Sequence, residues 1–177
     1  ESTLNRVAAW LGQVTRRHVV FDQREVLAAQ LRTGEGVVIL GAHLGNLDII
    51  RGVGQGDALF KINVLVHTKH AAKITSLLKK ANEQVDIELI QVSQIGPDTA
   101  MVLHEKVESG ECVVVLADRL SPADESRTVS ATVHGKEVRF PMGAFLLPSL
   151  LECPAYFMFC IKEADGKHHV YLDHYSD

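Results

Sequence analysis

The sequence predicts an α/β fold. We expect a single domain over residues 1–177, with a mixed, largely parallel sheet, helices on both faces and a β-hairpin near residues 128–140. Strand-like runs alternate with helical ones, and this order indicates β-α-β crossovers. A chain of 177 residues with 46% apolar content is long enough for one sizeable core. No repeat, low-complexity tract or linker divides it, so one domain is the expectation.

The expected elements follow from hydrophobic periodicity. Apolar residues at helical spacing predict helices at residues 4–14, 23–31, 71–82 and 98–108. Short apolar runs predict strands at residues 37–40, 62–66, 87–92, 112–117, 156–161 and 170–172. Two further runs, 128–133 and 137–140, flank His134-Gly135-Lys136, where glycine supplies the positive φ of a tight turn. These last two runs predict the hairpin.

Composition excludes several classes of protein. With 23% charged residues and a net charge of −4, nothing favours nucleic acid as a partner. Cys112, Cys153 and Cys160 lie in or beside apolar runs without CxxC spacing, which predicts buried thiols in a reduced, cytoplasmic protein. No apolar stretch reaches the length of a membrane span, so any membrane contact is expected to be peripheral or to come from segments outside this sequence.

The segment after the first predicted strand holds the strongest candidate site. His43 follows Gly41, and Asp48 lies five residues further on. If Asn46 caps a helix, His43 lies on the preceding loop and Asp48 in the first turn, from which its carboxylate reaches back to the imidazole. A histidine held by a carboxylate in a strand-to-helix crevice suits a general base. The alternative is a capping asparagine, a first-turn acid favoured by the helix dipole and a histidine that merely packs.

This His-x4-Asp arrangement resembles the signature of the glycerolipid and lysophospholipid acyltransferases. Its Gly-Asn and the preceding apolar strand are closer to the lipid A biosynthesis (lauroyl/myristoyl) acyltransferases. The resemblance extends from about Gly36 to Ile161, through the segments 110–119, 138–144 and 153–157, which agree in order and spacing. Family members usually have an arginine after the strand that here is 86–92, and this chain has none. An N-terminal membrane helix and a longer C-terminal portion are not seen either, so we expect a truncated or shortened member.

The resemblance implies a function. It implies transfer of a fatty acyl group from acyl carrier protein or coenzyme A to a hydroxyl of a lipid or glycolipid acceptor. The thioester donor is then a substrate, and no cofactor is expected. The implied location is cytoplasmic, with peripheral contact to the cytoplasmic face of the inner membrane.

Glycines and strand-end residues add candidates for substrate binding. Gly45 either satisfies backbone geometry or leaves room for a substrate, and N–H groups near Asn46 could hold an oxyanion. Asp118 ends a predicted strand, as part of the site or as a turn former. Since ligands collect at the carboxyl ends of strands, His43 and the Asp118-Arg119 pair are expected to open onto one crevice.

Three arginines are candidates for binding phosphate or phosphopantetheine: Arg119, Arg127 and Arg139. Guanidinium groups suit that role, although arginines on loops and hairpins are usually solvated. Residues 58–82 contain five lysines and no acidic residue, which predicts either a positive face for an acidic carrier protein or anionic lipid, or a solvated helix surface. His67 and His70 alone are too few ligands for zinc, so no metal site is predicted.

Missing motifs favour direct transfer. No Gly-x-Ser-x-Gly elbow occurs, and no cysteine has an obvious histidine partner, so an acyl-enzyme is not expected. Two alternatives stay open at this point: a thioester hydrolase in the same crevice, and a non-catalytic module that binds lipid or acyl carrier protein.

Overall fold

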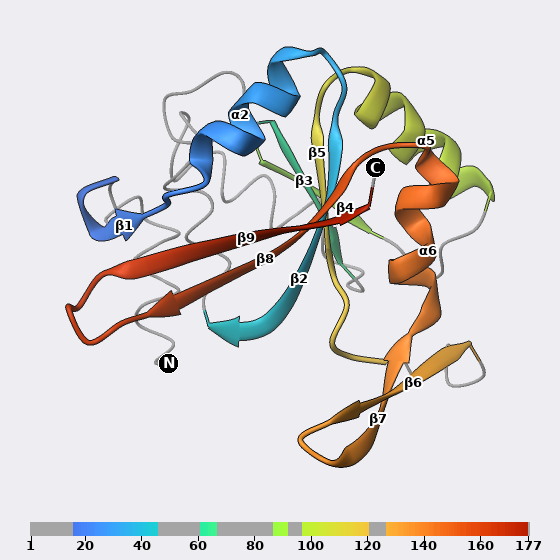
Figure 1. The fold of residues 1–177 in the computed structure, drawn as a ribbon. Coiled ribbons are helices and arrows are strands. Elements are labelled where there is room, and N and C mark those ends of the chain that lie inside the picture. The colour runs from blue at the N-terminus through green and yellow to red at the C-terminus, as the bar shows by residue number, and fades with distance from the viewer. Residues whose placement is uncertain (1–15, 46–60, 67–86, 92–96, 121–126, 177) are drawn as a thin grey trace.

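The computed structural model describes residues 16–45, 61–66, 87–91, 97–120 and 127–176. Its centre is a seven-stranded sheet in the order β1-β9-β8-β2-β5-β3-β4 (Figure 1). The strands are β1 (Val19–Val20), β2 (Val37–Gly45), β3 (Ile62–Val66), β4 (Ile87–Gln91), β5 (Cys112–Leu116), β8 (Ala155–Lys162) and β9 (His168–Ser176). All neighbouring pairs are parallel except β8 and β9. The predicted α/β class and the mixed, largely parallel sheet are confirmed.

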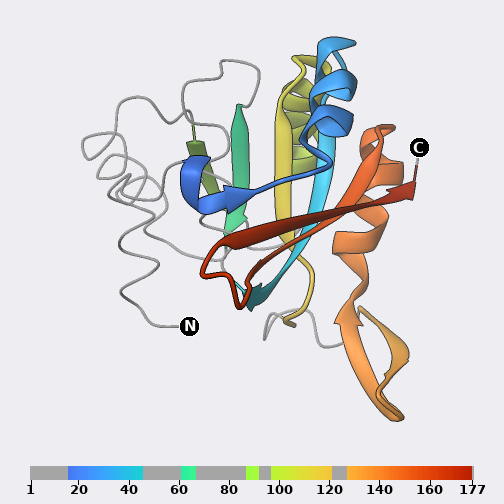
Figure 2. The same cartoon turned by 60° about the vertical axis from the view of Figure 1, so that its left-hand side comes forward.

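Helices cover both faces of this sheet. Helix α2 (Arg24–Arg32) lies on one face, while α5 (Pro97–Glu108) and α6 (Met142–Leu151) lie on the other (Figures 1 and 2). A short 3-10 turn, η1 (Arg16–His18), precedes β1. The helices predicted at 23–31 and 98–108 are confirmed with shifts of one residue, and those predicted at 4–14 and 71–82 lie outside the described residues.

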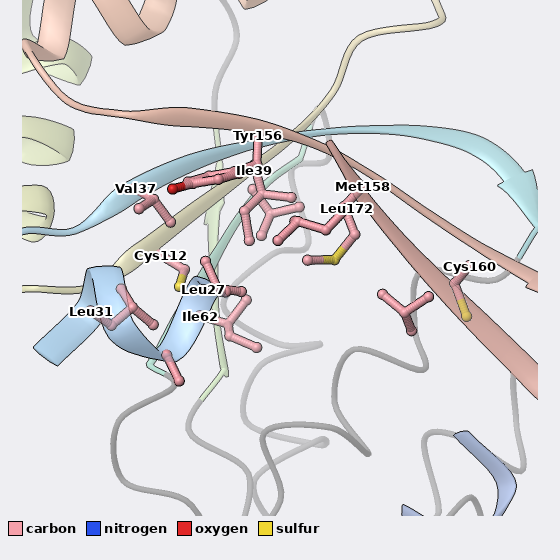
Figure 3. Packing of buried hydrophobic residues seen from close by; sticks show 13 residues of the cluster. Leu27, Leu31, Val37, Ile39, Ile62, Cys112, Tyr156, Met158, Cys160 and Leu172 are labelled. Carbon is pink, nitrogen blue, oxygen red and sulfur yellow. The ribbon is translucent and has the colours of Figure 1, made fainter. Parts of the chain in front are cut away.

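Strand β2 carries the core because it is buried on both sides. Val37 and Ile39 point to the face that α2 covers, where Figure 3 shows them among the packed side chains. Val38 and Leu40 point the other way, to the cluster under α5 and α6. All four are at most 1% exposed. The uninterrupted apolar run in the sequence reflects this double burial, since a strand with one solvated face would alternate.

The predicted hairpin is also confirmed. It consists of β6 (Thr128–Val133) and β7 (Lys136–Pro141), which pair antiparallel in a sheet of their own. The turn residues His134 and Gly135 both have positive φ, at 50° and 76°, as a two-residue type I′ turn requires. The hairpin projects from the body of the molecule beyond the start of α6 (Figures 1 and 2).

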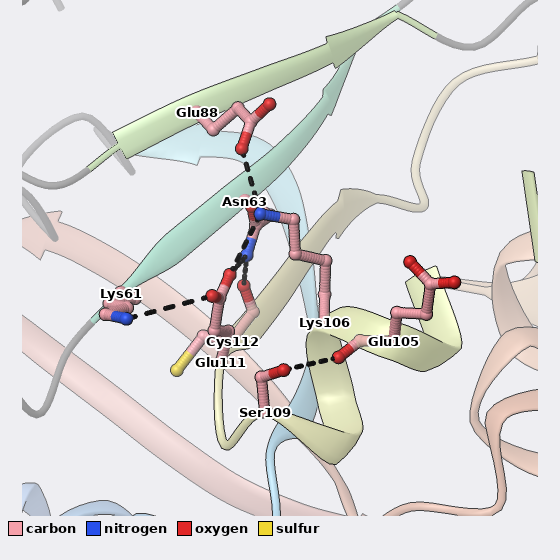
Figure 4. A network of polar contacts seen from close by, with 8 residues as sticks. All are labelled: Lys61, Asn63, Glu88, Glu105, Lys106, Ser109, Glu111 and Cys112. Carbon is pink, nitrogen blue, oxygen red and sulfur yellow. Dashed lines mark hydrogen bonds and ion pairs between the residues drawn. The ribbon is translucent and has the colours of Figure 1, made fainter. Parts of the chain in front are cut away.

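A polar network ties together the amino-terminal ends of the parallel strands. Asn63, 2% exposed, donates a hydrogen bond to Glu111 at 2.8 Å. Lys106 of α5 lies 3.0 Å from Glu88 and 3.3 Å from Glu111 (Figure 4). The hydrogen bond to Glu88 raises the pKa of Lys106, against the lowering effect of its burial. This network stabilises the end of the sheet opposite to the carboxyl ends of the strands.

The cysteines are buried and free, as predicted. They are Cys112, Cys153 and Cys160. Burial raises the pKa of Cys112 to about 12 and that of Cys153 to about 11, which keeps both thiols protonated and unreactive at neutral pH.

Within the described part of the chain, no helix has the length and apolar character needed to cross a membrane.

Replacing Leu147 by alanine tests the packing of α6. Leu147 is fully buried, so Leu147→Ala should lower the free energy of unfolding by about 2–5 kcal/mol. Its neighbour Leu146 is 56% exposed, and Leu146→Ala should change that free energy by about 0.5 kcal/mol or less. Denaturant unfolding of both variants measures the difference, and equal losses would contradict the placement of α6.

Candidate active site

Strand β2 extends further than the sequence predicted. It continues through His43 to Gly45, so the expectation that His43 lies on a loop is wrong. Its pairing with β8 is irregular there, because Gly41 opposes Met158 while Gly45 opposes Cys160. Three residues of β2 thus lie between paired positions where β8 has one. Such a bulge re-aims the side chains inside it, and His43 is at its centre.

The carboxylate of Asp118 binds His43, the residue at the centre of the bulge. Pairing between β2 and β5 ends where the Ala117 N–H donates to the Gly41 carbonyl at 2.9 Å. Asp118 comes next, and its Oδ2 accepts the backbone N–H of His43 at 3.0 Å. Its Oδ1 lies 2.8 Å from Nδ1 of the His43 ring. One carboxylate therefore holds the histidine at two points, which fixes both its backbone and its imidazole.

The electrostatics of this pair determine which ring nitrogen is free. Burial raises the pKa of Asp118, but hydrogen bonds from the ring and backbone of His43 outweigh it, so that the pKa lies below the ordinary 3.8. An ionised carboxylate accepts hydrogen bonds only, so the proton of a neutral imidazole belongs on Nδ1. Nε2 then keeps its lone pair. The two side chains are 32% and 28% exposed, which leaves the pair accessible from solvent.

The pair lies at the edge of the sheet formed by the carboxyl ends of its parallel strands. His43 and Asp118 stand at the carboxyl ends of two neighbouring parallel strands. After β2 the chain leads to β3 on one side, whereas after β5 it leads through α6 to β8 on the other. The carboxyl ends of parallel strands are the edge at which open α/β sheets bind their ligands. The structure thus brings His43 and Asp118 together at this edge, and the single crevice expected for His43 and the Asp118-Arg119 pair stays a prediction.

Gly45 permits the close approach of two strands. Its φ is +79°, and an added Cβ would overlap the carbonyl oxygen of Cys160 in β8. This contact supports the backbone-geometry interpretation of Gly45, because the space beside its Cα is filled by β8. The glycine thereby anchors the end of the bulge that carries His43.

No described contact joins the other predicted site residues to His43 or Asp118. Asn46 and Asp48 lie outside the described residues. Arg119 is exposed next to Asp118 in sequence, and Arg127 immediately precedes β6.

Arg139 lies in the middle of β7. In the residues that the structure covers, no hydrogen bond or ion pair links His43 or Asp118 to any of the three predicted arginines, Arg119, Arg127 and Arg139. Their substrate-binding role stays a prediction.

Sequence reasoning did not pair His43 with Asp118. It placed both residues at strand ends but assigned the orientation of the ring to Asp48, five residues away. Two apolar strands, each followed by a polar residue, were the available signal, but the sequence does not say which strands are neighbours. Among the described residues, no group of three or more histidine, cysteine or acidic side chains could hold a metal ion, and His67 and His70 lie outside them.

The sequence matches no protein-family model and has no significant match among curated proteins.

Substituting Gly45 tests the bulge. Alanine at positive φ costs about 1–2 kcal/mol, and at Gly45 the overlap with the Cys160 carbonyl adds to this cost. Gly34 has a similar φ of +87° with nothing within 4 Å of its added Cβ, so Gly34→Ala carries the backbone cost alone. Unfolding measurements should therefore show a larger loss for Gly45→Ala than for Gly34→Ala. Equal losses would contradict the close approach of β2 and β8.

Asp118 should contribute stability that depends on pH. Because its pKa in the folded protein is below 3.8, the contribution is present above about pH 4 and is lost as the pH falls through the folded value. The difference in unfolding free energy between the native protein and Asp118→Asn should be largest above that pH and shrink below it. In a His43→Ala background the difference should be smaller, since the ring hydrogen bond is missing. A difference independent of pH would refute the ionised pair.

Proposed function

We propose that the protein transfers a fatty acyl group from a thioester to a hydroxyl, with His43 as the general base. The observation that carries this proposal is the 2.8 Å hydrogen bond between Nδ1 of His43 and Asp118, which leaves Nε2 as a proton acceptor at the carboxyl ends of β2 and β5. The resemblance of the segment around His43 to lipid A acyltransferases supports the acyl chemistry.

The reaction runs in two steps on the imidazole. Nε2 of His43 removes the proton of the acceptor hydroxyl as its oxygen attacks the thioester carbonyl. The resulting tetrahedral intermediate collapses with cleavage of the carbon–sulfur bond. The imidazolium then returns the proton to the departing thiolate, so an ester and a free thiol are formed and His43 is regenerated. No acyl-enzyme is needed, consistent with cysteines that are buried and protonated.

Asp118 has a positioning role in this scheme. Its carboxylate holds the proton on Nδ1 and stabilises the imidazolium that forms during attack. Its second oxygen binds the backbone of His43, so the base is positioned before substrate arrives. A base held in this way contributes about 10²–10⁴-fold to the rate in other enzymes.

The other predicted residues complete the proposal. Acyl carrier protein or coenzyme A is the donor and a lipid or glycolipid hydroxyl the acceptor. Arg119, Arg127 and Arg139 are proposed to bind phosphate groups of these substrates. N–H groups near Asn46 are proposed to hold the oxyanion.

Substitutions of His43 and Asp118 test the assignment. Labelled acyl carrier protein and acyl-CoA are incubated with a lipid extract, and label in lipid is measured. We expect His43→Ala to abolish transfer and Asp118→Asn to reduce it about 10²–10⁴-fold, because the ring loses its fixed tautomer.

The chain offers a matched control. His169 also has an aspartate partner, since its Nε2 lies 3.0 Å from Asp165 near the turn between β8 and β9. His169→Ala should therefore keep native activity. Full transfer by His43→Ala would sink the proposal, and release of free fatty acid alone would favour the hydrolase.

A further inference from the structure

The hairpin has one apolar face that is exposed to solvent. The register places alternate residues of β6 and β7 on the same side. This apolar hairpin face consists of Val129, Ala131, Val133, Val138 and Phe140, with Lys136 opposite Val133 beside the turn. Its three valines are 44%, 40% and 37% exposed. An exposed apolar face that groups several aliphatic side chains is a candidate contact surface.

Helix α6 adds a second exposed apolar strip beside the hairpin. This α6 stripe consists of Met142, Leu146 and Leu150, which recur at every fourth position and are 37%, 56% and 56% exposed. The opposite side of α6 is buried in the core. The Phe140 ring of the hairpin packs edge-on against Phe145 of α6 at 6.2 Å between centroids. That contact joins the hairpin and the helix into one unit.

Cations outnumber acids in the hairpin, and one of them, Lys136, lies on its apolar face, whereas Arg139 pairs with Ser130 on the other face. Arg127, Lys136 and Arg139 are exposed in the segment 127–141, where Glu137 is the sole acid. Helix α6 contains no ionisable residue at all. This distribution contrasts with the net charge of −4 for the whole chain.

From these observations we propose that the apolar hairpin face and the α6 stripe dock on the surface of an anionic lipid bilayer. Aliphatic side chains enter the boundary between headgroups and acyl chains, while the ammonium group of Lys136 on the same face contacts anionic headgroups. The hairpin projects from the body (Figures 1 and 2), a shape suited to a deformable surface, whereas a protein partner would need a matching hollow.

Vesicle flotation tests this docking surface directly. The protein is mixed with vesicles of phosphatidylcholine alone or of phosphatidylcholine with phosphatidylglycerol, and bound protein is measured at low and high salt. We expect binding to the anionic vesicles, weakened by salt because the headgroup attraction is screened. Lys136→Gln should weaken it about fivefold, through loss of one cation. The double variant Val138→Ala/Leu146→Ala should weaken it about tenfold or more, through loss of inserted apolar groups.

Matched controls separate this surface from general effects. Val26→Ala removes a valine from α2 that is more exposed (52%) than Val138 (37%), and Lys162→Gln removes one positive charge at the end of β8, away from the hairpin. Both should bind as the native protein does. His43→Ala should also bind normally, so the result is independent of the proposed acyl transfer.

Three results would overturn the proposal. One is absence of binding to anionic vesicles, and another is binding that the hairpin and α6 variants leave unchanged. The third is a dimer in solution that the double variant dissociates, without vesicle binding, which would assign the surface to a second copy of the chain.

Discussion

The parallel pairing of β2 with β5 is the constraint on which the candidate site depends. The register aligns Val37 with Cys112 and keeps the two strands in step up to Gly41. Asp118 follows the last paired residues of β5 and so lies beside the bulged end of β2. There the carboxylate replaces the backbone acceptor that the strand no longer supplies, and it binds the His43 N–H together with the ring. A shift of one residue in this register would turn the side chains of β2 to the opposite faces and separate the pair.

Position in the fold, rather than the pairing of a histidine with an aspartate, distinguishes this site. His169 and Asp165 form a second such pair at 3.0 Å, but they belong to the turn region of an antiparallel hairpin. His43 and Asp118 instead lie where two parallel strands send the chain in opposite directions. The polar network of Asn63, Lys106 and Glu111 lies at the other end of the sheet, where it joins β3, α5 and the start of β5.

The β6–β7 hairpin has an apolar face that the described part of the chain leaves exposed. Valines at alternate positions of β6 favour a strand with one buried face, yet this face is exposed in the structure. In the core strands the same residue types are covered by helices on both sides. An apolar face that folding leaves uncovered lowers its free energy when it meets another apolar phase, and basic residues beside it favour an anionic one.

The sequence by itself determined the class of fold, most of the strands and the glycine turn of the hairpin, because hydrophobic periodicity and positive φ are local properties. It did not predict α6 by periodicity, since that helix is apolar on nearly every side and so lacks a polar face to define the period. Nor did it place the end of β2 or the partner of His43. Local spacing favoured Asp48, whereas strand order and register brought Asp118 to the ring from 75 residues away. Which strands become neighbours depends on how their apolar faces pack under the helices, and only the tertiary structure decides that.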